Sequence, residues 1–125
     1  MDVGQSRYAD VTVLRPVGRL DHGSSMAFQN TLMTAVGDGA GIKVLIDASG
    51  VDYVSSAGLR AFMIAFKQCR GGGGRMAIAG LKPLVAEIFQ ISRFDKVLEV
   101  HGTTADALAA LSADARAAFD AAGAT

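Results

Sequence analysis

The hydrophobic pattern of the chain is clearest between residues 42 and 70, where it changes from a continuous apolar run to a helical period. Residues 42–46 are apolar except for Lys43, which is typical of a strand covered on both faces. Asp47 ends this run, and Ala48 to Gly50 are turn residues. Apolar residues then recur at steps of three and four, which predicts an amphipathic helix packed on a sheet; they are Leu59, Phe62, Met63, Phe66 and Cys69.

The start of this helix is indicated by Ser55-Ser56, because either hydroxyl can accept a hydrogen bond from the unpaired N–H groups of the first turn. On its other side the period places Arg60, Lys67 and Gln68 in water, together with the aliphatic Ile64. An exposed Ile64 is either an ordinary surface residue or part of an interface.

The segments before residue 42 predict a hairpin and a helix. Residues 8–20 alternate in part and read as a strand near an edge or interrupted by a bulge, because Pro16 cannot donate to a ladder. Residues 3–8 are expected to pair with it across Ala9-Asp10. Ser24-Ser25 is expected to cap a helix that runs to about Val36, ended by the glycines of 37–41. Its predicted buried face is Phe28, Leu32, Ala35 and Val36.

After residue 70 the pattern predicts two more strands and two more helices. Gly71 to Gly74 read as a flexible connector, residues 76–79 as an interior strand, and Val97, Leu98 and Val100 as a last short strand. A helix starting at Lys82-Pro83 is expected to bury Leu84, Val85, Ile88 and Ile91. A closing helix capped by Thr103 or Thr104 is expected to bury Leu108, Leu111, Ala115 and Phe119. The alternation of strands and helices predicts an α/β fold, a mixed four- or five-stranded sheet packed with about four helices.

Composition narrows the class of protein. The chain has 125 residues, half of them hydrophobic, which is enough for one globular domain with its own core. Lysine plus arginine and aspartate plus glutamate both number 12, so the net charge gives no reason to expect nucleic-acid binding. The single Cys69 is expected to be a small buried hydrophobic residue. The first residues lack the pattern of a signal peptide and no apolar stretch reaches the roughly 20 residues of a membrane span, so we expect a cytoplasmic protein without a membrane partner.

Catalytic and metal-binding patterns find little support. His22 and His101 have no partner at ligand spacing, so we expect no metal site, and Ser56-Ala57-Gly58 lacks the first glycine of a nucleophile elbow. The glycine run follows a helix and lacks the ending of a phosphate loop. We therefore expect neither enzymatic activity nor a cofactor.

Asp47 has two further interpretations. As a phosphoacceptor of the receiver type it would need a pair of acidic residues after the first strand, and a lone Asp21 does not supply one. The alternatives that remain are an Asx-turn to Ser49 or Gly50 and contact with a partner.

Residues 45–60, Leu-Ile-Asp-Ala-Ser-Gly-Val-Asp-Tyr-Val-Ser-Ser-Ala-Gly-Leu-Arg, resemble the STAS domain of bacterial anti-sigma factor antagonists. Gly18-Arg19-Leu20-Asp21 and the stretch from Gly80-Leu81-Lys82-Pro83 to Ile91 extend the resemblance over nearly the whole chain. It implies a single STAS domain over residues 1–125.

The resemblance also implies a function: binding a kinase-type anti-sigma factor so that a sigma factor is released. In that family the hydroxyl positions just before this glycine carry a phosphate placed by the partner serine kinase, and a phosphatase would remove it. Aligned on Gly58, the chain has Ser55 in place of the usual Asp, Ser56 at the first hydroxyl position and Ala57 at the second. Ser56 is therefore the expected phosphoacceptor, with Ser55 in reserve. The expected partner-binding residues are Asp21, Asp47, Ser55, Ser56, Arg60 and Ile64, and Asp21, Asp47 and Asp52 are expected to make the surrounding surface acidic.

Two other functions remain open within the resemblance. One is a STAS scaffold or subunit without a phosphorylation cycle, as in a stressosome or a lipid-transport complex. The other is a small-ligand sensor, since some STAS domains bind nucleotides, although no phosphate-binding motif supports it here.

Overall fold

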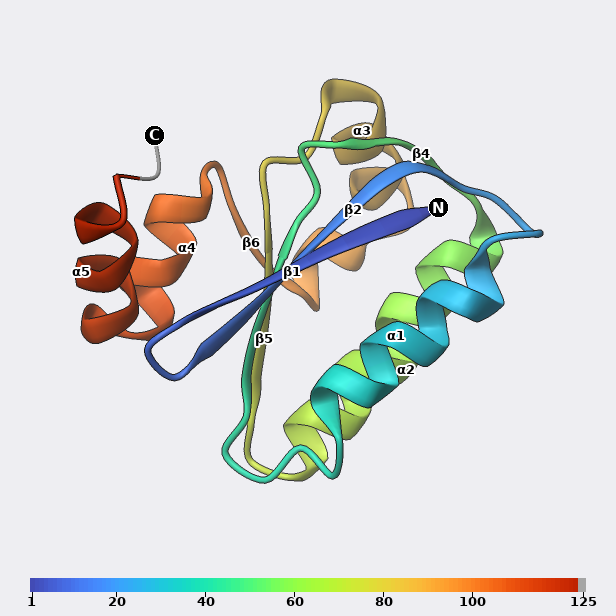
Figure 1. Ribbon diagram of the computed structural model, residues 1–125. Coiled ribbons are helices and arrows are strands. Elements are labelled where there is room, and N and C mark those ends of the chain that lie inside the picture. Colours follow the sequence, from blue (N-terminus) through green and yellow to red (C-terminus); the bar gives the residue numbers. More distant parts are fainter. Residues whose placement is uncertain (124–125) are drawn as a thin grey trace.

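The computed structural model describes residues 1–123, and within them six strands form one mixed sheet (Figure 1). The strands run in the order β1-β2-β3-β5-β6, and β4 pairs with the far end of β2. β1 is antiparallel to β2, and the other pairs are parallel. Their bounds are β1 Asp2–Tyr8, β2 Val11–Leu20, β3 Lys43–Asp47, β4 Val51–Val54, β5 Arg75–Ala79 and β6 Glu99–His101. The predicted α/β class is confirmed, with one strand more than the upper expectation.

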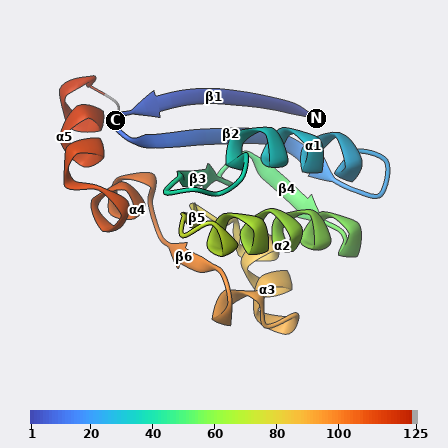
Figure 2. The same cartoon turned by 90° about the horizontal axis from the view of Figure 1, so that it is seen from below.

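Helices cover both faces of the sheet (Figures 1 and 2). α1, α2 and α3 contribute to one hydrophobic cluster, and α4 and α5 pack on the other face against Val11, Val13 and Leu45. No helix within residues 1–123 has both the length and the apolar character needed to cross a bilayer. Their bounds are α1 Ser25–Val36, α2 Ser56–Gly71, α3 Pro83–Ile91, α4 Thr104–Leu111 and α5 Ala113–Ala121, with a short 3₁₀ helix at Phe94–Lys96.

Pro16 is accommodated because β2 changes its parallel partner around it. β2 pairs with β3 only as far as Leu14, and its pairing with β4 begins at Gly18, where the register also shifts. The missing N–H of Pro16 therefore falls between two parallel ladders. The predicted hairpin of residues 3–20 and its interruption are both confirmed.

Three expected elements differ in detail. Residues 51–54, to which the sequence pattern assigned no strand, form β4. The last strand was expected to include Val97 and Leu98, but it begins at Glu99. Val97 and Leu98 lie in the segment that directly follows the 3₁₀ helix. The closing helix is two helices, because the Ser112 hydroxyl accepts a hydrogen bond from the Ala115 N–H at 3.2 Å and starts a new helix there.

Helix α3 is rotated relative to the prediction. Its buried residues are Val85 and Phe89, whereas Leu84 and Ile91 are exposed. Phe89 lies edge-to-face with Phe62 at 5.9 Å between ring centroids, and Phe62 packs in the same way on Phe28 at 5.1 Å. Burial of Phe89 in this aromatic row sets the orientation of the helix.

Two glycines of the run 71–74 are closely packed, which corrects the interpretation of the whole run as a flexible connector. A Cβ on Gly74 would lie 2.6 Å from the Ile42 carbonyl oxygen, and one on Gly72 would collide with the backbone of Asp38 and Gly39. Gly71 and Gly73 have open space around them. Two of the four glycines are therefore required by the close approach of two loops.

Acid is expected to weaken the junction of β5, β6 and α4. The Glu99 carboxylate accepts hydrogen bonds from Arg75 Nη2 at 2.8 Å to each oxygen and lies 2.8 Å from His101 Nε2, and Arg75 also donates to the Ala110 carbonyl. Burial raises the pKa of Glu99, but the hydrogen bonds and charges of His101 and Arg75 outweigh it, so the pKa is lowered. The ionised Glu99 therefore stabilises the folded state at pH values above the ordinary glutamate pKa. This stabilisation is lost as the pH falls through the lowered pKa of Glu99.

We expect Glu99→Gln to lower the free energy of unfolding by about 1 kcal/mol at neutral pH, because the pair is partly exposed. Urea unfolding at pH 7 and near pH 4 measures this, with Glu87→Gln on the exposed side of α3 as the matched control. An equal loss for both variants, or a Glu99→Gln effect unchanged by acid, would contradict this role.

Candidate functional site

The turn between β4 and α2 is held against the end of β2 by backbone bonding. The Ser55 N–H donates to the Leu20 carbonyl at 2.7 Å, and the Ser55 hydroxyl accepts a hydrogen bond from the Gly58 N–H at 3.2 Å. Ser55 is thus the N-cap of α2, which confirms a capping role for one of the two serines. Its hydroxyl is half-buried and already bonded.

Ser56 is the first residue of α2 and is exposed. Gly58 is buried two residues further along, and a Cβ there would lie 3.0 Å from Val54 Cγ1 and 3.1 Å from Leu20 Cβ. The glycine therefore lets the start of α2 lie against β2 and β4, with Ser56 on its outer side. Ala57 is half-buried and carries no hydroxyl.

Asp21 belongs to the same corner of the molecule, because it directly follows Leu20. Its carboxylate accepts hydrogen bonds from the Ser24 N–H at 3.0 Å and the Ser24 hydroxyl at 3.1 Å. The bond from the Ser24 N–H is the main cause of the lowered pKa of Asp21. Of the expected pair Ser24-Ser25, Ser24 is the N-cap residue of α1, but its side chain makes no capping hydrogen bond to the helix. The Asp21 carboxylate organises the turn instead.

Arg60 and Ile64 follow Ser56 on α2 at steps of four, so the three residues share one side of the helix. Arg60 is exposed as predicted. Ile64 is half-buried, which corrects the expectation that it points into water. Asp21, Ser55, Ser56 and Arg60 thus lie around the start of α2, and Ile64 lies two turns along it.

The expected acidic surface does not form as predicted. Asp52 makes an ion pair with Lys82 at 2.5 Å, and the Arg19 guanidinium lies over the Tyr53 ring, 4.6 Å from its centroid. α2 itself carries three cations and no acidic residue. The acidic residues are therefore accompanied by cations, and Arg60 is the cation nearest to Ser56 along α2.

Asp47 does not join this group. Its carboxylate accepts a hydrogen bond from the Ser49 N–H at 3.0 Å, so the Asx-turn is confirmed. The same side chain lines a cavity with Arg15, Thr104 and Phe119, beside α4 and α5 on the opposite face from α2. The sequence contains no signal for this cavity, because its walls come from residues more than 100 positions apart.

The fold and the arrangement of the turn define a small open-sheet α/β domain that presents a serine at the start of a helix. A family model described as the STAS domain matches residues 6–107, and the chain belongs to this family. The protein named "Putative anti-sigma factor antagonist BtrV" from Bordetella bronchiseptica is 40% identical over 68 residues, which cover 54% of this chain. That match spans 59% of the length of the relative.

Solved structures show the same fold. An anti-sigma-factor antagonist (STAS) domain protein from Planctomyces limnophilus superposes with a TM-score of 0.79 at 25% identity, covering 88% of this chain and 97% of its own. The Bacillus cell fate determinant SpoIIAA in its phosphorylated form gives a TM-score of 0.67 at 18% identity, covering 89% of this chain and 100% of its own. At this lower identity the likeness concerns the fold alone.

Proposed function

We propose that this protein is an anti-sigma factor antagonist that binds a kinase-type anti-sigma factor, frees a sigma factor and is switched off by phosphorylation of Ser56. The observation that carries the proposal is the division of roles between the two serines. Ser55 uses its hydroxyl to cap α2, whereas Ser56 is exposed and its hydroxyl makes no hydrogen bond within residues 1–123. The name of the Bordetella relative and the family membership support the same function.

The switch would act by local electrostatics. A phosphate on Ser56 adds about −1.5 to −2 charges at pH 7. The start of a helix tolerates negative charge, and Arg60, one turn along, is placed to interact with it. The phosphate therefore changes the binding surface more than the stability of the fold.

The surface proposed to contact the anti-sigma factor is the start of α2 with Asp21, Ser55, Ser56 and Arg60, extended by Ile64 along the helix. The proposed role of Asp47 is support of the turn that leads to β4, because its carboxylate holds Ser49 and lies on the other face. A phosphatase that restores Ser56 completes the proposed cycle. SpoIIAA, whose structures include an unphosphorylated and a phosphorylated form, is an example of a protein of this fold that carries the modification.

Peptide mass spectrometry of the protein purified from its own cells, with and without phosphatase treatment, tests the proposal. A phosphate on Ser56 that phosphatase removes is the expected result. A phosphate on Ser55 instead would move the switch to the capping residue and overturn the assigned roles. An unmodified chain across growth and stress conditions would favour the scaffold function.

A further inference from the structure

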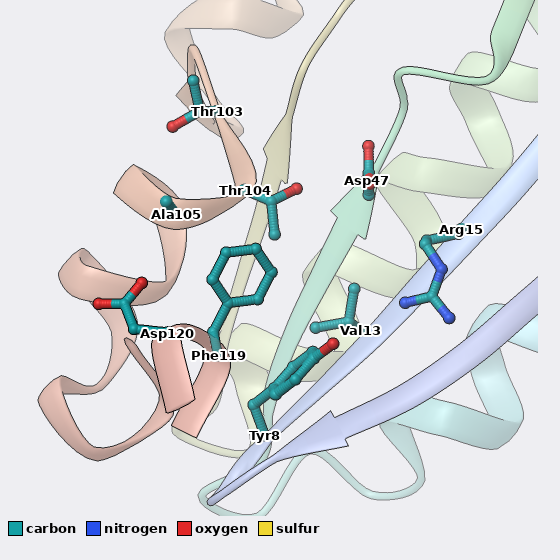
Figure 3. A pocket seen from close by; sticks show the side chains of 9 residues that line it. All are labelled: Tyr8, Val13, Arg15, Asp47, Thr103, Thr104, Ala105, Phe119 and Asp120. Atoms are coloured by element: carbon teal, nitrogen blue, oxygen red, sulfur yellow. The ribbon is translucent and has the colours of Figure 1, made fainter. Parts of the chain in front are cut away.

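A second region with the features of a binding site lies on the opposite face of the sheet from α2. A cavity of about 530 Å³ opens there between β1, β2 and the pair α4 and α5 (Figure 3). Its size is within the range of small-molecule sites, which is roughly 300–1,000 Å³. It is also near the carboxyl ends of parallel strands, since Asp47 ends β3 and Thr103 follows β6 by two residues, and this is where open α/β sheets bind ligands.

The apolar part of the cavity is aromatic. Phe119 of α5 and Tyr8 of β1 lie edge-to-face with ring centroids 5.3 Å apart, and Val13 of β2 lies beside them. Figure 3 shows the Phe119 ring between Thr104 and Tyr8. Both aromatic residues are half-buried, so part of each ring is free to contact a flat apolar molecule.

The polar part of the cavity contains one cation without an acidic partner. Arg15 donates to the Ser6 hydroxyl at 2.7 Å and makes no ion pair within residues 1–123. Asp120, at the rim, is already paired with Arg116 at 3.1 Å. Arginine binds carboxylates through two parallel hydrogen bonds, and four of the five N–H groups of Arg15 make no hydrogen bond within residues 1–123.

Two further groups restrict the kind of ligand. Thr104 directs its hydroxyl toward the cavity (Figure 3). The Asp47 carboxylate, which accepts one hydrogen bond from the Ser49 N–H, also lines the cavity and can accept a second hydrogen bond from a ligand. A dianionic phosphate would meet a single arginine and the negative charge of Asp47, whereas a monoanion matches the charge of Arg15.

From this geometry we propose that the cavity between β1, β2, α4 and α5 binds a small aromatic carboxylate that also carries a hydrogen-bond donor. Its ring packs on Phe119 and Tyr8, its carboxylate binds Arg15, and its donor faces Asp47. The site uses none of the residues at the start of α2, so its test does not require the proposed phosphorylation switch.

A titration of the ¹⁵N-labelled chain with 4-hydroxybenzoate, followed by two-dimensional NMR, tests the proposal. We expect saturable shifts of the amides of Val13, Arg15, Thr104 and Phe119, and clearly weaker binding of the uncharged isostere 4-hydroxybenzamide. Arg15→Gln should weaken 4-hydroxybenzoate binding about tenfold or more, because it removes a charge-assisted contact. Its NMR spectrum also reports whether the variant remains folded.

The matched control is Arg7→Gln, because Arg7 lies on the same strand as Tyr8 and lines a different surface depression beside α1. It should leave the affinity unchanged. The proposal is overturned if 4-hydroxybenzoate causes no saturable shifts at these residues, if Arg15→Gln binds as tightly as the unchanged chain, or if the amide binds equally well. Binding of GTP at these residues in preference to 4-hydroxybenzoate would overturn the ligand class.

Discussion

Ser56→Asp is expected to bind the anti-sigma factor at least about tenfold more weakly than Ser56→Ala, and phosphorylated Ser56 about 100-fold more weakly. A loss of about 2.8 kcal/mol in binding is enough for the larger effect. Ser56→Ala should bind like the unmodified chain and remain active as an antagonist. Titration calorimetry with the isolated anti-sigma factor measures all three affinities.

The expected effect comes from the position of Ser56 on α2. Its side chain is exposed at the first helical residue, so a partner that covers the start of α2 must also cover whatever Ser56 carries. Covering an added carboxylate or phosphate removes its water, which costs binding free energy unless the partner supplies a matching cation. Arg60 can compensate within the chain, but only by withdrawing its own charge from the interface.

Two controls separate this mechanism from a general effect of charge or folding. Gln5→Glu adds one negative charge on the exposed side of β1 and should leave the affinity unchanged. Thermal unfolding should show Ser56→Asp to be as stable as Ser56→Ala, because negative charge is favourable at a helix start. Equal partner affinities for the two Ser56 variants would rule out the proposed switch.

The parts of this site that were predictable from the sequence are local in the chain. Ser55, before an apolar helical period, caps the helix by accepting a hydrogen bond from the N–H three residues ahead, and Asp47, at the start of a turn, accepts one from the N–H two residues ahead. The surrounding charge was not predictable, because Asp52 is neutralised by Lys82, 30 residues further along. Asp47 is close to Ser56 in sequence, but its side chain lines a cavity on the other face of the sheet.

In the fold, too, the features that depend on local sequence were predictable and those that depend on distant contacts were not. Periodicity located the strands and helices because burial of one face repeats along the chain. It could not orient α3, because Leu84 and Ile91 are as apolar as Phe89, and only the aromatic row with Phe62 selects which of them is buried. β4 has four residues, too few to show a period, and depends on the end of β2 for its pairing.

Contacts between loops that are distant in the sequence determine which glycines of the run 71–74 are required. Gly72→Ala is expected to lower the free energy of unfolding by about 3 kcal/mol, because the added methyl group would collide with the backbone of Asp38 and Gly39. Gly41 also donates to the Gly72 carbonyl at 3.4 Å, so both loops would have to move. Urea unfolding monitored by circular dichroism measures the loss.

Gly71→Ala is the matched control, one residue earlier at the end of α2, where an added Cβ meets nothing within 4 Å. This change should be neutral or slightly stabilising, because alanine restricts the unfolded chain and favours a helix. If both variants unfold at the same urea concentration as the unchanged chain, the run is the flexible connector that its composition indicates. If Gly72→Ala alone is destabilised, the close approach of the loops at Gly39 and Gly72 fixes how α2 leads into β5.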